Sequence, residues 1–201
     1  MKKISLIFVC VLCLLALCLT GCKNKTDADD PALAEFGNKM AQSDVTTASA
    51  KVTYTIPVEG QEEPLVMTAT FKAYDSVSDE SNTLSVPYFV PVTTDGSEVV
   101  LPDNTTDELQ LSEKAAKSIA SVKLGDLTFS SGYFEGGDYT LDNTGFSATV
   151  TDLSAFFGID VAIEKADVSI TVKGNGLVGK MLVSYTTELG NAVSITITYG
   201  Y

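Results

Sequence analysis

The side chains able to carry chemistry form a short inventory in this chain of 201 residues. There are 26 acidic side chains, 13 basic ones that are all lysine, four cysteines, and no histidine or arginine. Without histidine and arginine, the usual nucleophile–base pairs and the usual oxyanion or phosphate clamps are missing. Carboxylates remain, but none stands in a spacing typical of glycoside hydrolysis. The composition predicts a protein that is not an enzyme, with a carboxylate-dependent hydrolase as an alternative.

Metal binding is equally restricted by the residue types. Transition metals such as zinc lack their histidine and cysteine ligands. Two acidic segments, 103–108 and 138–143, offer oxygen atoms to calcium, but neither fits the EF-hand loop. We therefore expect solvated loops there, and we expect neither a metal nor a cofactor.

The one cysteine with an expected role is Cys22. Lys2 and Lys3 precede an apolar run over residues 4–19, and the sequence Leu19-Thr20-Gly21-Cys22 follows. A positive start, a short apolar run and small residues are typical of a secretory signal. The Leu-Thr-Gly-Cys ending resembles the lipobox of bacterial lipoproteins. That resemblance implies cleavage before Cys22 and a diacylglyceryl group, with fatty acyl chains such as palmitate, on its sulfur.

This segment predicts a protein anchored in the cell envelope through acylated Cys22. Two alternatives remain open, an uncut membrane anchor and a signal that is not lipidated. The apolar run is shorter than the roughly 20 residues that a transmembrane helix needs. Lys23 does not resemble the aspartate that retains some lipoproteins in an inner membrane, so the outer membrane is favoured.

Charge and cysteine placement bound the mature protein further. Removal of residues 1–21 takes away two lysines and changes the formal charge from −13 to −15. A surface of this sign repels nucleic acid, so nucleic-acid binding is not expected. All four cysteines lie at or before Cys22, which leaves no disulfide for the folded part. The identity of any protein partner does not follow from these residues.

The chain divides into three parts by pattern. Residues 1–21 form the signal peptide, 22–48 a lipidated tether with a possible short helix, and 49–201 the folded domain. Within the tether, Asp30 and Pro31 can cap a helix whose apolar residues share one face. These apolar residues are Leu33, Phe36 and Met40.

Beyond Lys51 the apolar residues alternate with polar ones, as in half-buried strands. The predicted strands lie within residues 52–58, 65–73, 84–92, 98–101, 122–129, 146–150, 168–172, 181–185 and 193–201. Turns are predicted at Gly174-Asn175-Gly176 and Gly190-Asn191, and a single helical turn around residues 112–117. The pattern indicates an all-β fold, an antiparallel meander that closes into a β-barrel of about eight strands.

The segment Val122–Phe129 and the hairpins over 168–173, 180–185 and 193–199 resemble the calycin-like, or lipocalin-like, β-barrel domain of secreted bacterial lipoproteins. The resemblance covers roughly residues 51–201. It implies a barrel that holds a small apolar ligand in its interior.

The candidate ligand residues are Phe156, Phe157, Ala148 and Tyr185. The two phenylalanines form the most apolar connection, and they are interpreted as a gate at the barrel mouth, an anchor for a partner or a plug of the core. Ala148 is small enough to leave space inside, and Tyr185 lies in an inward row. The expected function is non-catalytic binding of a small apolar ligand or a partner. A surface interaction or structural protein with a fully packed barrel is the alternative.

Overall fold

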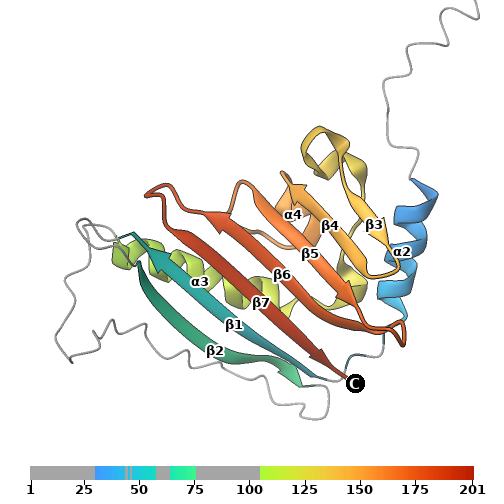
Figure 1. Ribbon diagram of the computed structural model, residues 1–201, viewed down its shortest axis with the longest axis horizontal. Coiled ribbons are helices and arrows are strands. Elements are labelled where there is room, and N and C mark those ends of the chain that lie inside the picture. The colour runs from blue at the N-terminus through green and yellow to red at the C-terminus, as the bar shows by residue number, and fades with distance from the viewer. Residues whose placement is uncertain (1–29, 44, 46, 58–63, 76–104) are drawn as a thin grey trace, which may run out of the picture.

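The computed structural model describes residues 30–43, 45, 47–57, 64–75 and 105–201. In these ranges the protein is mostly β, with one seven-stranded antiparallel sheet and several helices (Figure 1). Cys22 and the strands predicted over 84–92 and 98–101 lie outside the described residues.

Five consecutive strands form a meander in which each pairs with the next. These are β3 (Thr140–Asp142), β4 (Gly145–Val150), β5 (Ala166–Val172), β6 (Val178–Thr186) and β7 (Ala192–Gly200). The hairpin of β1 (Thr47–Ile56) and β2 (Leu65–Asp75) continues the sheet, because β1 pairs with β7. The sheet order is β2-β1-β7-β6-β5-β4-β3, so the predicted antiparallel pairing is confirmed.

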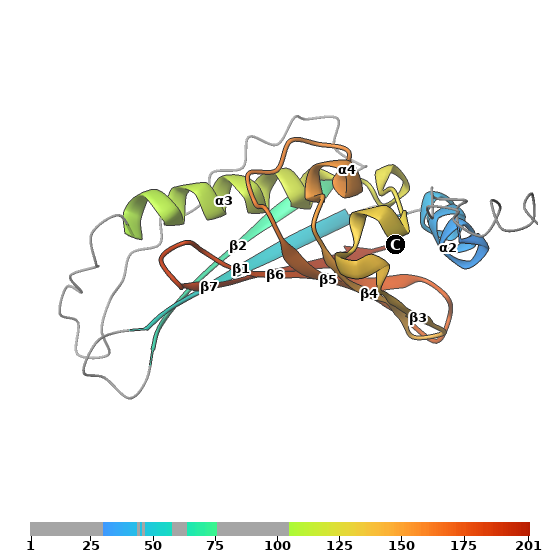
Figure 2. The same ribbon diagram turned by 90° about the horizontal axis from the view of Figure 1, so that it is seen from above.

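The sheet is open in the described ranges. Strands β2 and β3 are its two edges, and no described residue of one pairs with the other. Closure into an eight-stranded barrel is therefore not confirmed. The description all-β also needs correction, because a helix layer covers one face of the sheet (Figure 2).

The largest part of that layer is α3 (Thr105–Ser121), a helix of 17 residues where the sequence analysis predicted one turn. Its buried face repeats at helical spacing through Leu109, Ala116 and Ile119. Alanine, which carries little apolar signal but favours helices, provides much of this face. The apolar pattern in the sequence therefore indicated a much shorter helix than the structure contains.

Alternation along the strands separates the two faces of the sheet. Val52, Ile195, Val183 and Val168 lie side by side across four strands, and each is at most 1 % exposed. Helices α3 and α4 (Leu153–Phe157) lie on this face (Figure 2). The next row, displaced by one residue, faces the opposite way and is polar; it contains Thr53, Ser194, Ser184 and Asp167.

The predicted N-terminal helix is present as α2 (Pro31–Ala41). The Asp30 side chain accepts a hydrogen bond from the Ala32 backbone N–H at 2.9 Å, which caps the first turn. Leu33, Phe36 and Met40 are buried as predicted, and the Phe36 ring packs against the rings of Phe129 and Phe146. A domain boundary at residue 49 would therefore separate residues that pack in one core.

The segment 122–129, which resembled a calycin strand, is not a strand. It contains the 3-10 turn η1 (Leu124–Asp126) and continues into η2 (Ser131–Tyr133) and η3 (Glu135–Gly137). The apolar spacing lengthens from two to three residues between Leu124 and Leu127, so these side chains cannot share one face of a strand. The backbone instead runs beside α4, where the Thr128 N–H donates to the Phe156 carbonyl at 2.9 Å.

An aromatic cluster joins these irregular segments to the sheet. The ring centroids of Phe129, Phe146 and Phe156 lie 5.2–6.2 Å from one another, and Phe134 lies 5.4 Å from Phe146. Such separations are typical of favourable ring pairs. The cluster holds α2, the 122–137 segment, β4 and α4 together.

Gly145→Ala is expected to lower the free energy of unfolding by about 3 kcal/mol or more. Gly145 has a φ of 146°, and an added Cβ would overlap the carbonyl oxygen of Ile170 on the paired strand. Gly190→Ala is the matched control, because Gly190 also has a positive φ but open space around it. It should lose only the backbone term of about 1 kcal/mol. Equal losses in urea unfolding would contradict the described β4–β5 register.

Candidate functional site

A cleft of about 360 Å³ lies where the helix layer meets one end of the sheet. One wall is the first part of α3, the second is the segment 162–165 between α4 and β5, and the third is the end of β6 with the residues that follow it. Its lining residues are Glu108, Leu111, Ser112, Ala162, Ile163, Glu164, Lys165, Tyr185, Thr186, Thr187 and Glu188. Small-molecule sites in proteins typically have volumes of about 300–1,000 Å³, so the cleft is of a suitable size.

Tyr185 brings a buried polar atom to this cleft. Its hydroxyl is inaccessible to solvent and makes no hydrogen bond of normal geometry to the described part of the chain. Burial raises the pKa of Tyr185 and the charge of Glu108 adds to the rise, while the neighbouring Ser112 hydroxyl acts in the opposite direction. A buried hydroxyl without a well-formed hydrogen bond is costly to the fold.

Glu108 is held beside the cleft by a network of hydrogen bonds. The Tyr54 hydroxyl donates to Glu108 Oε2 at 2.6 Å, and Asn191 Nδ2 donates to the same oxygen at 3.0 Å. The Leu189 backbone N–H donates to Oε1 at 3.0 Å. Because Tyr54 is 0 % exposed and Asn191 4 % exposed, this network fixes the first turns of α3 against β1 and the β6–β7 turn.

The network also sets the charge of Glu108. Burial alone raises the pKa of this carboxyl, but the hydrogen bonds from Tyr54, Thr187, Asn191 and Leu189 outweigh it and lower the pKa below its ordinary value of 4.5. Burial, together with the hydrogen bond to Glu108, raises the pKa of Tyr54. Glu108 is thus an ionised carboxylate at neutral pH, and Tyr54 is a neutral donor to it.

Apolar groups complete the cleft. The Leu111 side chain is 58 % exposed and offers apolar surface to the cleft. Ile163 is half-buried and packs against the edge of the core, and Ala162 is exposed. An apolar wall next to a few polar groups is suited to bind an amphiphilic molecule.

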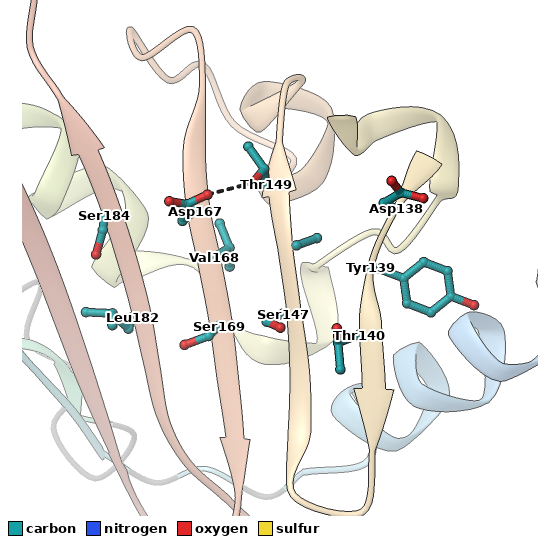
Figure 3. Close-up of a pocket in the computed structure, with 11 residues that line it drawn as sticks. Asp138, Tyr139, Thr140, Ser147, Thr149, Asp167, Val168, Ser169, Leu182 and Ser184 are labelled. Carbon is teal, nitrogen blue, oxygen red and sulfur yellow. Dashed lines mark hydrogen bonds between the residues drawn. The ribbon is translucent and has the colours of Figure 1, made fainter. Parts of the chain in front are cut away.

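A second, shallower hollow of about 410 Å³ lies on the uncovered face of the sheet (Figure 3). Serine and threonine side chains from β4, β5 and β6 line it, and Thr149 Oγ1 donates to Asp167 Oδ1 at 2.6 Å. Asp167 and the serines and threonines that line this hollow are all exposed or partly exposed. Such a composition is typical of a solvated sheet face. The cleft beside Tyr185 is therefore the better candidate site.

The structure places the four predicted ligand residues as follows. Phe156 and Phe157 belong to α4 and are 0 % exposed, within the aromatic cluster. Ala148 is half-buried on β4, two residues from Phe146 and hence on the same face of the sheet. Tyr185 lines the cleft. All four lie on the helix-covered face, but only Tyr185 belongs to the candidate site.

Most of the cleft was missed in the sequence. Glu108 stands in a segment interpreted as a solvated loop, and Leu111 and Ser112 stand in one interpreted as a single helical turn. The acidic segment 138–143, a weak calcium candidate, forms β3 and a tight turn instead. There Asp142 Oδ1 accepts from the Thr144 backbone N–H at 2.7 Å and from the Thr144 hydroxyl at 2.6 Å.

Two further structural findings concern metals and membranes. Within the described ranges, no three acidic, cysteine or histidine side chains are grouped so that they could hold a metal ion. None of the helices in those ranges is long and apolar enough to cross a membrane.

Comparison with known proteins gives structural similarity but no match in sequence. No protein-family model matches the sequence, and no curated protein matches it. Among solved structures, the chain is similar to the lipoprotein LppX of Mycobacterium tuberculosis, with a TM-score of 0.35 and 13% sequence identity over 86% of this chain and 95% of that one. This TM-score is below the level that indicates a shared fold.

Glu108→Ala is expected to cost about 2 kcal/mol of unfolding free energy at pH 7, because it removes a charged acceptor from buried donors. Glu113→Ala on the same helix is the control, since it breaks only the surface ion pair with Lys117 and should cost about 0.5 kcal/mol or less. A carboxyl with a lowered pKa stabilises the fold above its unfolded pKa, and this contribution disappears as the pH falls through the folded pKa. The difference between parent and variant should therefore narrow below pH 4.5. A pH-independent difference in urea unfolding would contradict the network.

Proposed function

We propose that this protein is a non-catalytic lipoprotein of the cell envelope that is anchored through acylated Cys22 and binds a small amphiphilic ligand. The cleft beside Tyr185 carries the binding part of the proposal, because it combines a suitable volume with an apolar wall and a few polar and charged groups. The sequence Leu19-Thr20-Gly21-Cys22 supports the anchoring part.

The proposed anchor and the proposed binding cleft are compatible, because little chain separates Cys22 from the folded part. The first described residue is Asp30, whose carboxylate accepts hydrogen bonds from Ala32 and from the Tyr139 hydroxyl. Only seven residues separate Cys22 from Asp30, so the acylated end would hold the folded part close to the membrane surface. The ligand site would then be reached by molecules of the envelope. We include the outer membrane in the proposal, because Lys23 follows Cys22 where some lipoproteins of the inner membrane have an aspartate.

Binding instead of catalysis is supported by the groups at the cleft. Glu108 accepts hydrogen bonds at both of its oxygens, and its lowered pKa makes it a poor proton donor or acceptor at neutral pH. No histidine, arginine or thiol is available in residues 105–201 to act as a partner. The polar groups can orient a ligand, but they do not form a nucleophile with its base.

Cys22→Ser tests the anchor. The variant lacks the only thiol that would remain after cleavage, so it should accumulate as an uncleaved or soluble form. The parent should partition into the detergent phase of a Triton X-114 separation, and its mass should carry a diacylglyceryl group. A control variant with Cys18→Ser keeps Cys22 and should behave as the parent does. Detergent partitioning of a cleaved Cys22→Ser protein would overturn the lipoprotein proposal.

A fluorescent apolar probe tests the cleft. N-Phenyl-1-naphthylamine, which is uncharged at neutral pH, should bind the mature protein at one site. Ala162→Trp should weaken this binding by about tenfold or more, because an indole on the cleft wall occupies the apolar space. Ala192→Trp is the matched control, since Ala192 is also exposed but faces the uncovered side of the sheet.

Failure of the probe to bind the parent would overturn the ligand proposal and favour a packed structural module. Equal weakening by Ala162→Trp and Ala192→Trp would also overturn the assignment to this cleft. Circular dichroism of each variant must match the parent before its affinity is compared.

A further inference from the structure

The charged groups around the cleft are almost all negative. Among the lining residues, Glu108, Glu164 and Glu188 are acidic and Lys165 is the one base. Lys165 Nζ forms an ion pair with Glu135 Oε1 at 2.7 Å, and Glu135 is not one of the residues that line the cleft. The field that a ligand meets in the cleft is therefore negative.

The charge next to Tyr185 also favours a cation over an anion. Tyr185, which lines the cleft, lies within the electrostatic reach of Glu108. Both oxygens of Glu108 already accept hydrogen bonds from the protein, so this carboxylate attracts through its charge and not by a new direct bond. An ammonium group in the cleft would gain from the charges of Glu108, Glu164 and Glu188, whereas a carboxylate or phosphate would be repelled by them.

Leu111 and Ile163 supply the apolar wall of the cleft. Leu111 is 58 % exposed and Ile163 is half-buried, so both offer apolar surface to an alkyl chain. A ligand that places its head near Tyr185 and its chain along these two residues satisfies both parts of the cleft. We propose that the cleft selects amphiphiles with a cationic head group, of which an alkylammonium is the simplest, over neutral and anionic ones with the same chain. This inference rests on the proposed ligand-binding function and adds the ligand's charge.

The experiment compares three amphiphiles that differ only in the head. Dodecylammonium, dodecanol and dodecanoate, each below its micelle concentration, compete with N-phenyl-1-naphthylamine for the mature protein at pH 7. Dodecylammonium should displace the probe at about a tenfold lower concentration than dodecanol, and dodecanoate should be the weakest. Raising the salt from 0.05 to 0.5 M should reduce the advantage of the cation and leave dodecanol unchanged, because salt screens the carboxylates.

Two sets of variants separate site charge from net charge. Glu164→Gln with Glu188→Gln should reduce the preference for dodecylammonium over dodecanol at least threefold, while the affinity for dodecanol stays constant. Glu35→Gln with Glu113→Gln makes the same change in net charge away from the cleft and should leave the preference unaltered.

The outcomes distinguish this inference from the function on which it rests. If the naphthylamine probe does not bind the parent, the proposed ligand site is wrong, and the inference falls with it. If the probe binds in the cleft but the three amphiphiles displace it equally, or dodecanoate is the strongest, the ligand site stands and the selection of cations is overturned. Equal effects of the two glutamine pairs would overturn it too.

Discussion

The packing of aromatic rings around Phe146 and Phe156 is the interaction on which the described part of the fold depends. Phe146 belongs to β4 and Phe156 to α4, and both are at most 3 % exposed. Rings from α2 and from the irregular 122–137 segment close around them. The described ranges contain no cysteine, so no disulfide can replace this packing. Loss of a ring at the centre of such a cluster typically costs about 3–5 kcal/mol, a large part of the stability of a domain.

The same packing positions the candidate site. Phe156 and Phe157 bury α4 in the core, and the segment between α4 and β5 then lines the same cleft as the end of β6, so that Ile163 and Tyr185 both contribute to it. The opposite wall is fixed by a different interaction, the network that binds Glu108 to Tyr54 and Asn191. The cleft is thus bounded by one wall held by apolar packing and one held by hydrogen bonds. Walls held in two independent ways favour a preformed site, which loses little conformational entropy when a ligand binds.

The sequence predicted the strands better than the helices and the site, for physical reasons. Alternation identifies β5, β6 and β7 because one face of each is buried and the other is polar, and the turn glycine Gly176 has the positive φ that its position requires. The full length of helix α3 was not predicted because its buried face depends on alanine. The segment 122–129 was wrongly predicted as a strand because its apolar residues are two positions apart except between Leu124 and Leu127. The cleft was not predictable from local pattern, since Glu108, Ile163 and Tyr185 come from three separate segments. Only Tyr185 was identified among them, and it was identified as an inward-facing residue of a barrel.

The proposed selection of cations rests on charge, because the shape of the cleft alone would not distinguish head groups on the same chain. Two unit charges about 8 Å apart at an effective dielectric constant of about 20 interact with about 2 kcal/mol, which exceeds the 1.4 kcal/mol of a tenfold change in affinity. One well-placed carboxylate such as Glu108 is therefore enough to separate a cationic head from an anionic one. Donors from Tyr54, Asn191 and Leu189 hold Glu108 in place, so its charge acts from a fixed position, although salt still screens it. The hydrogen bonds that stabilise α3 against the sheet also keep that charge near Tyr185, so the stability of the fold and the proposed preference of the site depend on the same carboxylate.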